Sequence, residues 1–127
     1  MKSETVEIIW SKDAGDELLE IISYIKHNTG KMTAEKIYNK ITEEVKKAFG
    51  NATGRRISPL LKEFGINDIH QLNINPWIIY YRVEQNVMKI ISIIDSRRNL
   101  EEILYKKVIV GNFPVTDTAP HKGPTAP

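Results

Sequence analysis

Two adjacent arginines, Arg97 and Arg98, stand where an apolar segment of the sequence gives way to polar residues. The apolar segment, 87–94, is rich in isoleucine and valine and predicts a β-strand. A strand that carries two guanidinium groups to its end holds them on a rigid support. Guanidinium groups bind phosphates and carboxylates through paired, charge-assisted hydrogen bonds. The sequence therefore predicts a small cationic site for a phosphate or an acidic partner at this strand end.

Four basic side chains and one acidic side chain form the set that could contact such a partner. The formal net charge is only +2, so a general electrostatic attraction to nucleic acid receives little support. The basic residues nevertheless gather in the second half of the sequence. They are either solvated surface charges or a binding set. The binding interpretation assigns partner contacts to Arg82, Asp95, Arg97, Arg98 and Lys106.

Asp95 and Arg82 each leave two interpretations open. Asp95 lies two residues before Arg97 on the same strand face, so it either pairs with that arginine or contacts a partner. Arg82 follows Tyr81 on a strand, and the two side chains must point to opposite faces. Arg82 therefore either pairs with Glu84 or lines the open face of the sheet.

His70 has the side chain best suited to acid–base chemistry. It alternates with Leu72 and Ile74, as in a half-buried strand, and an imidazole can act as a general base near neutral pH. A lone histidine in a strand is more often structural. In a ribonuclease, the catalytic set would be His70, Arg82 and Arg97. No two histidines have metal-ligand spacing and there are no cysteines, so we expect no metal site and no cofactor.

The elements that must position these side chains begin with a β-hairpin. Two apolar segments rich in β-branched residues, 77–83 and 87–94, flank the polar turn Glu84-Gln85-Asn86, which is the pattern of a hairpin. A further strand is predicted over residues 70–74. A short helix follows the two arginines and begins at Asn99, a residue type that caps helices well.

The first half of the sequence predicts a strand and two helices. A strand over residues 5–10 is followed by Ser11, which can cap a helix that ends at Gly30. Thr33 can cap a second helix, with Gly50 as its stop. Each helix carries one apolar stripe, and a short loop between them would lay both stripes on a common sheet. We therefore predict an α+β fold in the order β-α-α-β-β-β(α), an antiparallel sheet covered by an N-terminal helical hairpin.

An ordered set of these features resembles the RelE/ParE superfamily of toxins, often described as plasmid stabilization proteins. The set comprises an aromatic residue at the start of a strand, an apolar-Tyr-Arg-Val segment, a hairpin, and an Arg-Arg pair before a leucine-rich helix. The opening strand and first helix cap are similar as well. The residues concerned are 8–14, Trp77, 79–83, Arg97-Arg98 and 100–104, and the resemblance covers roughly residues 5–108.

The resemblance implies two branches with different chemistry. In the RelE branch, strand-borne basic residues and an acid–base group cleave messenger RNA in the ribosome. Carried over by position, the arginine that ends the last strand is retained as Arg97. The remaining basic positions fall at Ile69, Gln71 and Ile78, and the tyrosine of the final helix falls near Ile103. Because this nuclease set is missing, the ParE-like branch is the better match.

ParE-like members are identified as inhibitors of DNA gyrase that act by stoichiometric binding. The resemblance thus implies a toxin of a type II toxin–antitoxin system, neutralised by a cognate antitoxin that folds on the toxin surface. It leaves open a homodimer or a heterotetramer with the antitoxin. Two alternatives stand beside this reading: a RelE-like, ribosome-dependent endoribonuclease of mRNA with an atypical site, and a non-toxic relative that still binds an antitoxin.

The sequence also predicts a domain boundary. Residues 1–110 form the expected toxin domain. Residues 111–127 hold four of the six prolines and few apolar residues, which is typical of a flexible tail. No apolar run approaches the ~20 residues of a membrane span, and the N-terminus has no signal-peptide pattern. We therefore expect a cytoplasmic protein without a membrane partner.

Overall fold

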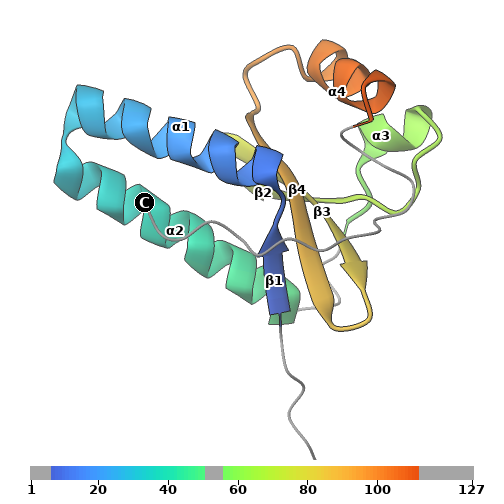
Figure 1. The fold of residues 1–127 in the computed structure, drawn as a ribbon, viewed down its shortest axis with the longest axis horizontal. Coiled ribbons are helices and arrows are strands. Elements are labelled where there is room, and N and C mark those ends of the chain that lie inside the picture. Colours follow the sequence, from blue (N-terminus) through green and yellow to red (C-terminus); the bar gives the residue numbers. More distant parts are fainter. Residues whose placement is uncertain (1–6, 51–55, 112–127) are drawn as a thin grey trace, which may run out of the picture.

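The computed structural model describes residues 7–50 and 56–111. Its elements follow in the order β1 (Glu7–Trp10), α1 (Lys12–Thr29), α2 (Lys31–Gly50), α3 (Pro59–Glu63), β2 (His70–Ile74), β3 (Trp77–Glu84), β4 (Val87–Asp95) and α4 (Leu100–Ile109). Figure 1 shows the long helices α1 and α2 together on one side of the sheet, and the shorter α3 and α4 on the other. The α+β fold expected from the sequence is confirmed.

Helix α1 begins and ends at the residues that the sequence indicates. The Ser11 hydroxyl accepts a hydrogen bond from the Ala14 backbone N–H at 3.0 Å, which caps the first turn. Leu18 and Ile22, one turn apart, are buried on the face that packs against the rest of the molecule. Gly30 ends the helix with φ 114°, a conformation that residues with a side chain rarely adopt.

Helix α2 begins earlier than the sequence analysis expected. Thr33 was the predicted cap, but the helix starts at Lys31. The carbonyl of Gly30 already accepts a hydrogen bond from the Ala34 N–H at 3.1 Å. Gly30 therefore terminates one helix and precedes the next directly, and Thr33 lies inside the first turn of α2. This tight connection makes α1 and α2 an antiparallel pair.

The sheet has the strand order β1-β4-β3-β2. The antiparallel prediction holds for β2, β3 and β4, whereas β1 joins the sheet parallel to β4. A short apolar strand carries no local signal for its direction, so the parallel pairing is decided by the tertiary structure. The hairpin between β3 and β4 closes at Gln85 and Asn86, and Gln85 adopts φ 56°, as two-residue hairpin turns require.

Two hydrophobic clusters pack on the two faces of this sheet. Beneath the α1–α2 hairpin, the cluster includes Ile79 and Tyr81 of β3. On the opposite face, Tyr80 packs with Leu61 of α3 and Leu104 of α4. The register of β3 against β4 shifts after Tyr80, which is a β-bulge in β4. Because neighbouring residues alternate between two buried faces, both strands are mostly apolar along their length.

The described part of the chain ends just after α4. The Gly111 N–H donates to the Val108 carbonyl at 3.2 Å and closes the turn after α4. From residue 112 onward the expected tail lies outside the described residues, so the division into domain and tail stays a prediction. Within 7–50 and 56–111, no helix is both long and apolar enough to cross a membrane.

Candidate functional site

The turn after β4 holds its side chains by a compact set of hydrogen bonds. The Asp95 carboxylate accepts from the Arg97 backbone N–H and from Arg97 Nε, both at 2.9 Å, and also from Nη2. The Arg98 N–H donates to the Asp95 carbonyl at 3.1 Å, and the Ser96 N–H donates to the Pro76 carbonyl at 2.7 Å. Of the two interpretations left open for Asp95, the structure supports pairing with Arg97. These hydrogen bonds fix the turn that carries both arginines, and their contact with a partner stays a prediction.

The Asp95–Arg97 pair shifts both ionisation equilibria. Hydrogen bonds from the Arg97 side chain and backbone stabilise the carboxylate and lower the pKa of Asp95 to about 2. The hydrogen bond to Asp95 in turn raises the pKa of Arg97 above its usual value. Both groups therefore stay charged at neutral pH. The Arg97 side chain remains 76% exposed, so its guanidinium is oriented by Asp95 and still accessible to a partner.

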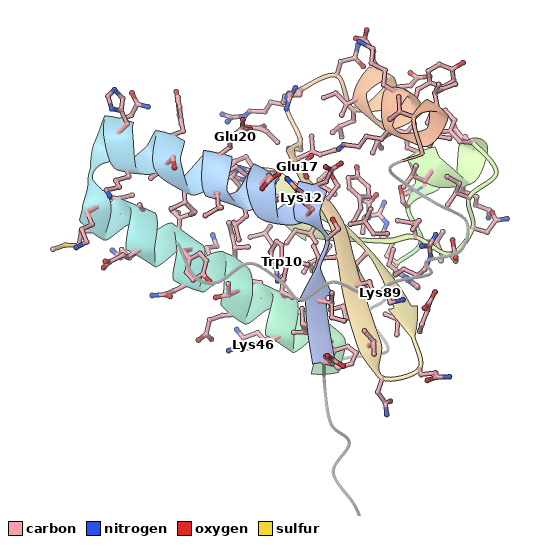
Figure 2. The ribbon with its side chains drawn as sticks, in the orientation of Figure 1. Trp10, Lys12, Glu17, Glu20, Lys46 and Lys89 are labelled. Carbon is pink, nitrogen blue, oxygen red and sulfur yellow. The ribbon has the colours of Figure 1, made fainter. Side chains whose placement is uncertain are left out.

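A groove of about 620 Å³ opens beside this turn, between the helical hairpin and the end of the sheet. Its apolar lining comes from α1, α2, β3 and β4. The residues are Ile21, Ile25, Ile37, Trp77, which pairs with Asp95 across the strands, and Ile93. Arg97 and Arg98 line it from the turn, and the carboxylates of Glu17 and Glu20 line it from α1. Figure 2 shows these two glutamates on α1. The groove thus combines an apolar floor with charges of both signs.

Glu17 is a site residue that the sequence analysis missed. One of its carboxylate oxygens accepts from the Ser92 hydroxyl at 2.8 Å and from the Ile93 N–H at 3.0 Å. The other accepts from Lys107 Nζ at 2.9 Å. Because β1 pairs with β4 only as far as Ile90, the Ile93 N–H needs a partner from elsewhere. No local pattern marks Glu17, since its partners lie 75 to 90 residues away.

Arg82 and His70 lie away from the groove. Arg82 is buried and forms an ion pair with Asp68 at 2.8 Å, rather than pairing with Glu84 as one interpretation held. His70 stacks on the Tyr81 ring, with the ring centroids 5.3 Å apart. Since Tyr81 and Arg82 are adjacent in a strand, His70 and Arg82 occupy opposite faces of the sheet.

The three residues of the alternative ribonuclease site are therefore not brought together. The register pairs Trp77 with Asp95 and Arg82 with Lys89. These two rows are five residues apart along β3, or about 16 Å at the usual strand rise. Arg97 follows the first row, whereas Arg82 belongs to the second. A shared active site of His70, Arg82 and Arg97 has no support in this geometry.

Lys106 and Lys107 are neighbours on α4 with different surroundings. The Lys106 side chain is 72% exposed and lies 3.4 Å from Glu102 in the preceding turn. The Lys107 side chain points inward and is only 14% exposed, between Glu17 at 2.9 Å and Asp13 at 3.7 Å. Lys106 is thus accessible, and the partner contact that the sequence analysis assigned to it stays a prediction. Lys107 instead fastens α4 to α1.

Comparison with known proteins assigns the chain to a family. The model of the family described as "ParE toxin of type II toxin-antitoxin system, parDE" matches residues 8–100. The chain belongs to the ParE toxin family. The matched region includes the sheet, the helical hairpin and both arginines, and it ends at the first residue of α4. The resemblance drawn from the sequence is therefore confirmed, and this chain is a ParE-type toxin of a toxin–antitoxin system.

A solved structure shares the fold of this ParE-family chain. A chain of the "Chromosomal ParDE TA system from P. aeruginosa" superposes with a TM-score of 0.59 and is 21% identical in sequence. The similarity covers 73% of this chain and 98% of the other. At that identity the likeness establishes a common fold. No curated protein matches the sequence.

Proposed function

We propose that this ParE-family toxin binds and inhibits DNA gyrase stoichiometrically and that a cognate antitoxin neutralises it. Family membership supports the toxin role. One observation favours binding over catalysis. His70 and Arg82 lie on opposite faces of the sheet, and Arg97 lies at the other end of the hairpin from Arg82. A phosphodiester cleavage site needs its acid–base and charge-stabilising groups within reach of one phosphate. These three residues do not meet that requirement.

The groove beside the Asp95–Arg97 turn is the surface we assign to the antitoxin, and we propose that Arg97 and Arg98 contact gyrase when the antitoxin is absent. Its apolar floor suits the apolar face of an amphipathic helix. Arg97 and Arg98 on one rim suit acidic side chains of that helix, and the exposed Glu20 on the other suits a basic one. A disordered segment that folds into such a groove buries its apolar residues and satisfies both rims at once.

A pair of assays tests the target. Purified toxin should inhibit gyrase supercoiling of a plasmid and accumulate cleaved DNA, and it should leave messenger RNA intact on translating ribosomes. Addition of the antitoxin encoded beside it should restore supercoiling. Codon-specific cuts seen by primer extension, and lost in His70→Ala or Arg97→Ala, would overturn the proposal in favour of a ribonuclease. A folded protein that inhibits neither process would identify a non-toxic relative.

A further inference from the structure

The distal half of the α1–α2 hairpin carries a second groove. In Figure 1 the two long helices extend past the sheet before the chain turns from α1 into α2. A groove of about 490 Å³ lies on this projecting part, and residues of both helices between positions 22 and 39 line it. We call it the hairpin groove. It shares no lining residue with the groove beside Arg97, so it is a separate site.

The lining of the hairpin groove includes apolar side chains and an aromatic ring. Ile22 of α1 and Ala34 of α2 are buried where they line it. Tyr38 is half-buried, lines the groove and packs against the hydrophobic core. An aromatic side chain that the core holds in place offers a fixed surface on which a planar ring can stack.

Two exposed lysines bring positive charge to this groove, Lys26 from α1 and Lys31 from α2. Neither forms an ion pair in the described part of the chain, whereas Lys12 and Lys47 on the same helices pair with carboxylates at 2.9 and 3.7 Å. Residues 22–39 contain three lysines and one glutamate, so their net charge of +2 equals that of the whole chain. The small total charge therefore hides a local positive surface that suits an anion.

Three polar side chains complete the hairpin groove: Ser23, Glu35 and Asn39. A hydroxyl and an amide can both donate and accept hydrogen bonds, and a carboxylate accepts them from amino groups. Glu35 would repel the carboxylates of a polyacidic peptide. A nucleobase, in contrast, presents donors as well as acceptors at its edge. The groove thus combines cations for phosphates, a ring for a base and polar groups for the base edge.

We propose that the hairpin groove binds one unstacked nucleotide of a single nucleic-acid strand. The base stacks on Tyr38, and Lys26 and Lys31 contact the phosphates on its two sides. A groove of about 490 Å³ is in the size range of small-ligand sites and can hold one nucleotide. A duplex is a poorer ligand, because its bases are stacked inside the double helix. The inference goes beyond the gyrase proposal and does not rest on it.

Fluorescence anisotropy with the full-length toxin alone tests the ligand class. The probe is a labelled single strand of DNA of about 20 nucleotides, and we expect saturable binding that weakens as the salt concentration rises. The duplex of the same length should bind more weakly, and polyglutamate should compete poorly. No binding, a duplex that binds as tightly as the single strand, or polyglutamate that competes as well as unlabelled strand would each overturn the proposal.

Removal of the two lysines tests the phosphate contacts. Lys26→Gln combined with Lys31→Gln should weaken binding and lower the slope of log affinity against log salt by about 1.4, because each phosphate contact on a single strand contributes about 0.7. Lys12→Gln combined with Lys62→Gln is the matched control. It removes the same charge from exposed lysines outside the groove and should leave the slope unchanged. Equal slopes in the two double variants would contradict the assignment.

The arginine pair separates this inference from the proposed function. Arg97→Ala combined with Arg98→Ala should abolish gyrase inhibition and keep the affinity for the single strand. A larger loss of strand affinity here than in the lysine double variant would place the strand in the groove beside Arg97 and overturn the inference. A toxin that binds the strand through the hairpin groove but does not inhibit gyrase would contradict the gyrase proposal alone.

Substitutions of Tyr38 test the stacking contact. Tyr38→Leu keeps an apolar side chain but removes the ring, and it should weaken strand binding about fivefold or more, whereas Tyr38→Phe should retain the wild-type affinity. Tyr24→Leu is the control, since Tyr24 is 70% exposed on α1 and lines the other groove. Circular dichroism checks that each variant is folded. A folded Tyr38→Leu variant with wild-type affinity would refute the stacking contact and the proposal with it; if this variant does not fold, the exposed lysine pair decides.

Discussion

Arg97 and Arg98 are adjacent in sequence but have different roles in the structure. The Asp95 carboxylate accepts hydrogen bonds from the side chain and the backbone of Arg97. Arg98 takes no part in these side-chain bonds and lines the groove. The pKa of Asp95 is lowered to about 2, so its ionised form is favoured in the folded state. The pair therefore adds stability above the usual carboxyl pKa of 3.8, and this contribution is lost as the pH falls toward 2.

Alanine substitutions should separate the two arginines. We expect Arg98→Ala to keep the melting temperature of the wild-type protein and to reduce toxicity, because it removes an accessible charge from the groove. Arg97→Ala should also reduce toxicity but should lower the melting temperature slightly near neutral pH, because Asp95 loses its partner. The double variant should be folded and non-toxic. Growth after induced expression and thermal melts measure both effects.

Two controls sharpen this comparison. Lys40→Ala removes an exposed cation from α2 and should change neither property. The stability difference between wild type and Arg97→Ala should shrink in melts at about pH 2.5, where the Asp95 carboxylate begins to take up a proton. A double variant that is folded, equally stable and fully toxic would refute both roles.

At the scale of elements, Glu17 joins three parts of the fold that are distant in sequence. It lies on α1, receives hydrogen bonds from Ser92 and Ile93 of β4, and binds Lys107 of α4. The bond to Ile93 satisfies a strand edge that β1 leaves uncovered. The bond to Lys107 fastens the last helix to the first.

The Glu17→Gln substitution should therefore destabilise the protein. Glutamine keeps an acceptor oxygen but removes the charge that Lys107 needs in its largely buried position. We expect a loss of about 1–3 kcal/mol, or roughly 4–8 °C in melting temperature for each kcal/mol in a domain of this size. Chemical and thermal denaturation provide the measurement.

A matched change on the same helix serves as the control. Glu20→Gln removes an exposed carboxylate from α1 and should leave stability within ~0.5 kcal/mol. Combining Glu17→Gln with Lys107→Met should cost less than the sum of the two single changes, because the second change removes the cation that the first leaves unpaired. Additive losses would show that the two residues act separately.

At the scale of the whole molecule, the described residues form two hydrophobic clusters on the two faces of one sheet. Residues 112–127 follow α4 and are poor in apolar side chains. Deleting them should change the stability by ~1 kcal/mol or less, which is a shift of a few degrees in melting temperature. A large loss on deletion would show that this segment packs on the domain.

Most of the elements were predictable because their signals are local, although α2 begins earlier than expected and α3 is missing from the predicted order of elements. Ser11 and Asn99 cap their helices through hydrogen bonds to backbone N–H groups three residues on. The β-branched segments around Gln85 pair with each other across a two-residue turn. The pairing of Asp95 with Arg97 was one of two local alternatives, since both residues lie on one strand face. The family, too, was recognisable from an ordered set of such local features.

The tertiary structure alone decided the contacts between distant segments. Three of these contacts follow from how the elements pack. They are the parallel pairing of β1 with β4, the burial of Arg82 against Asp68, and the position of Glu17 between β4 and α4. These contacts pair backbone and charged groups that have no partner within their own helix or strand. Which group pairs with which depends on the elements that lie close together in the folded protein. For the same reason, the groove beside Arg97 could be located only in the folded chain.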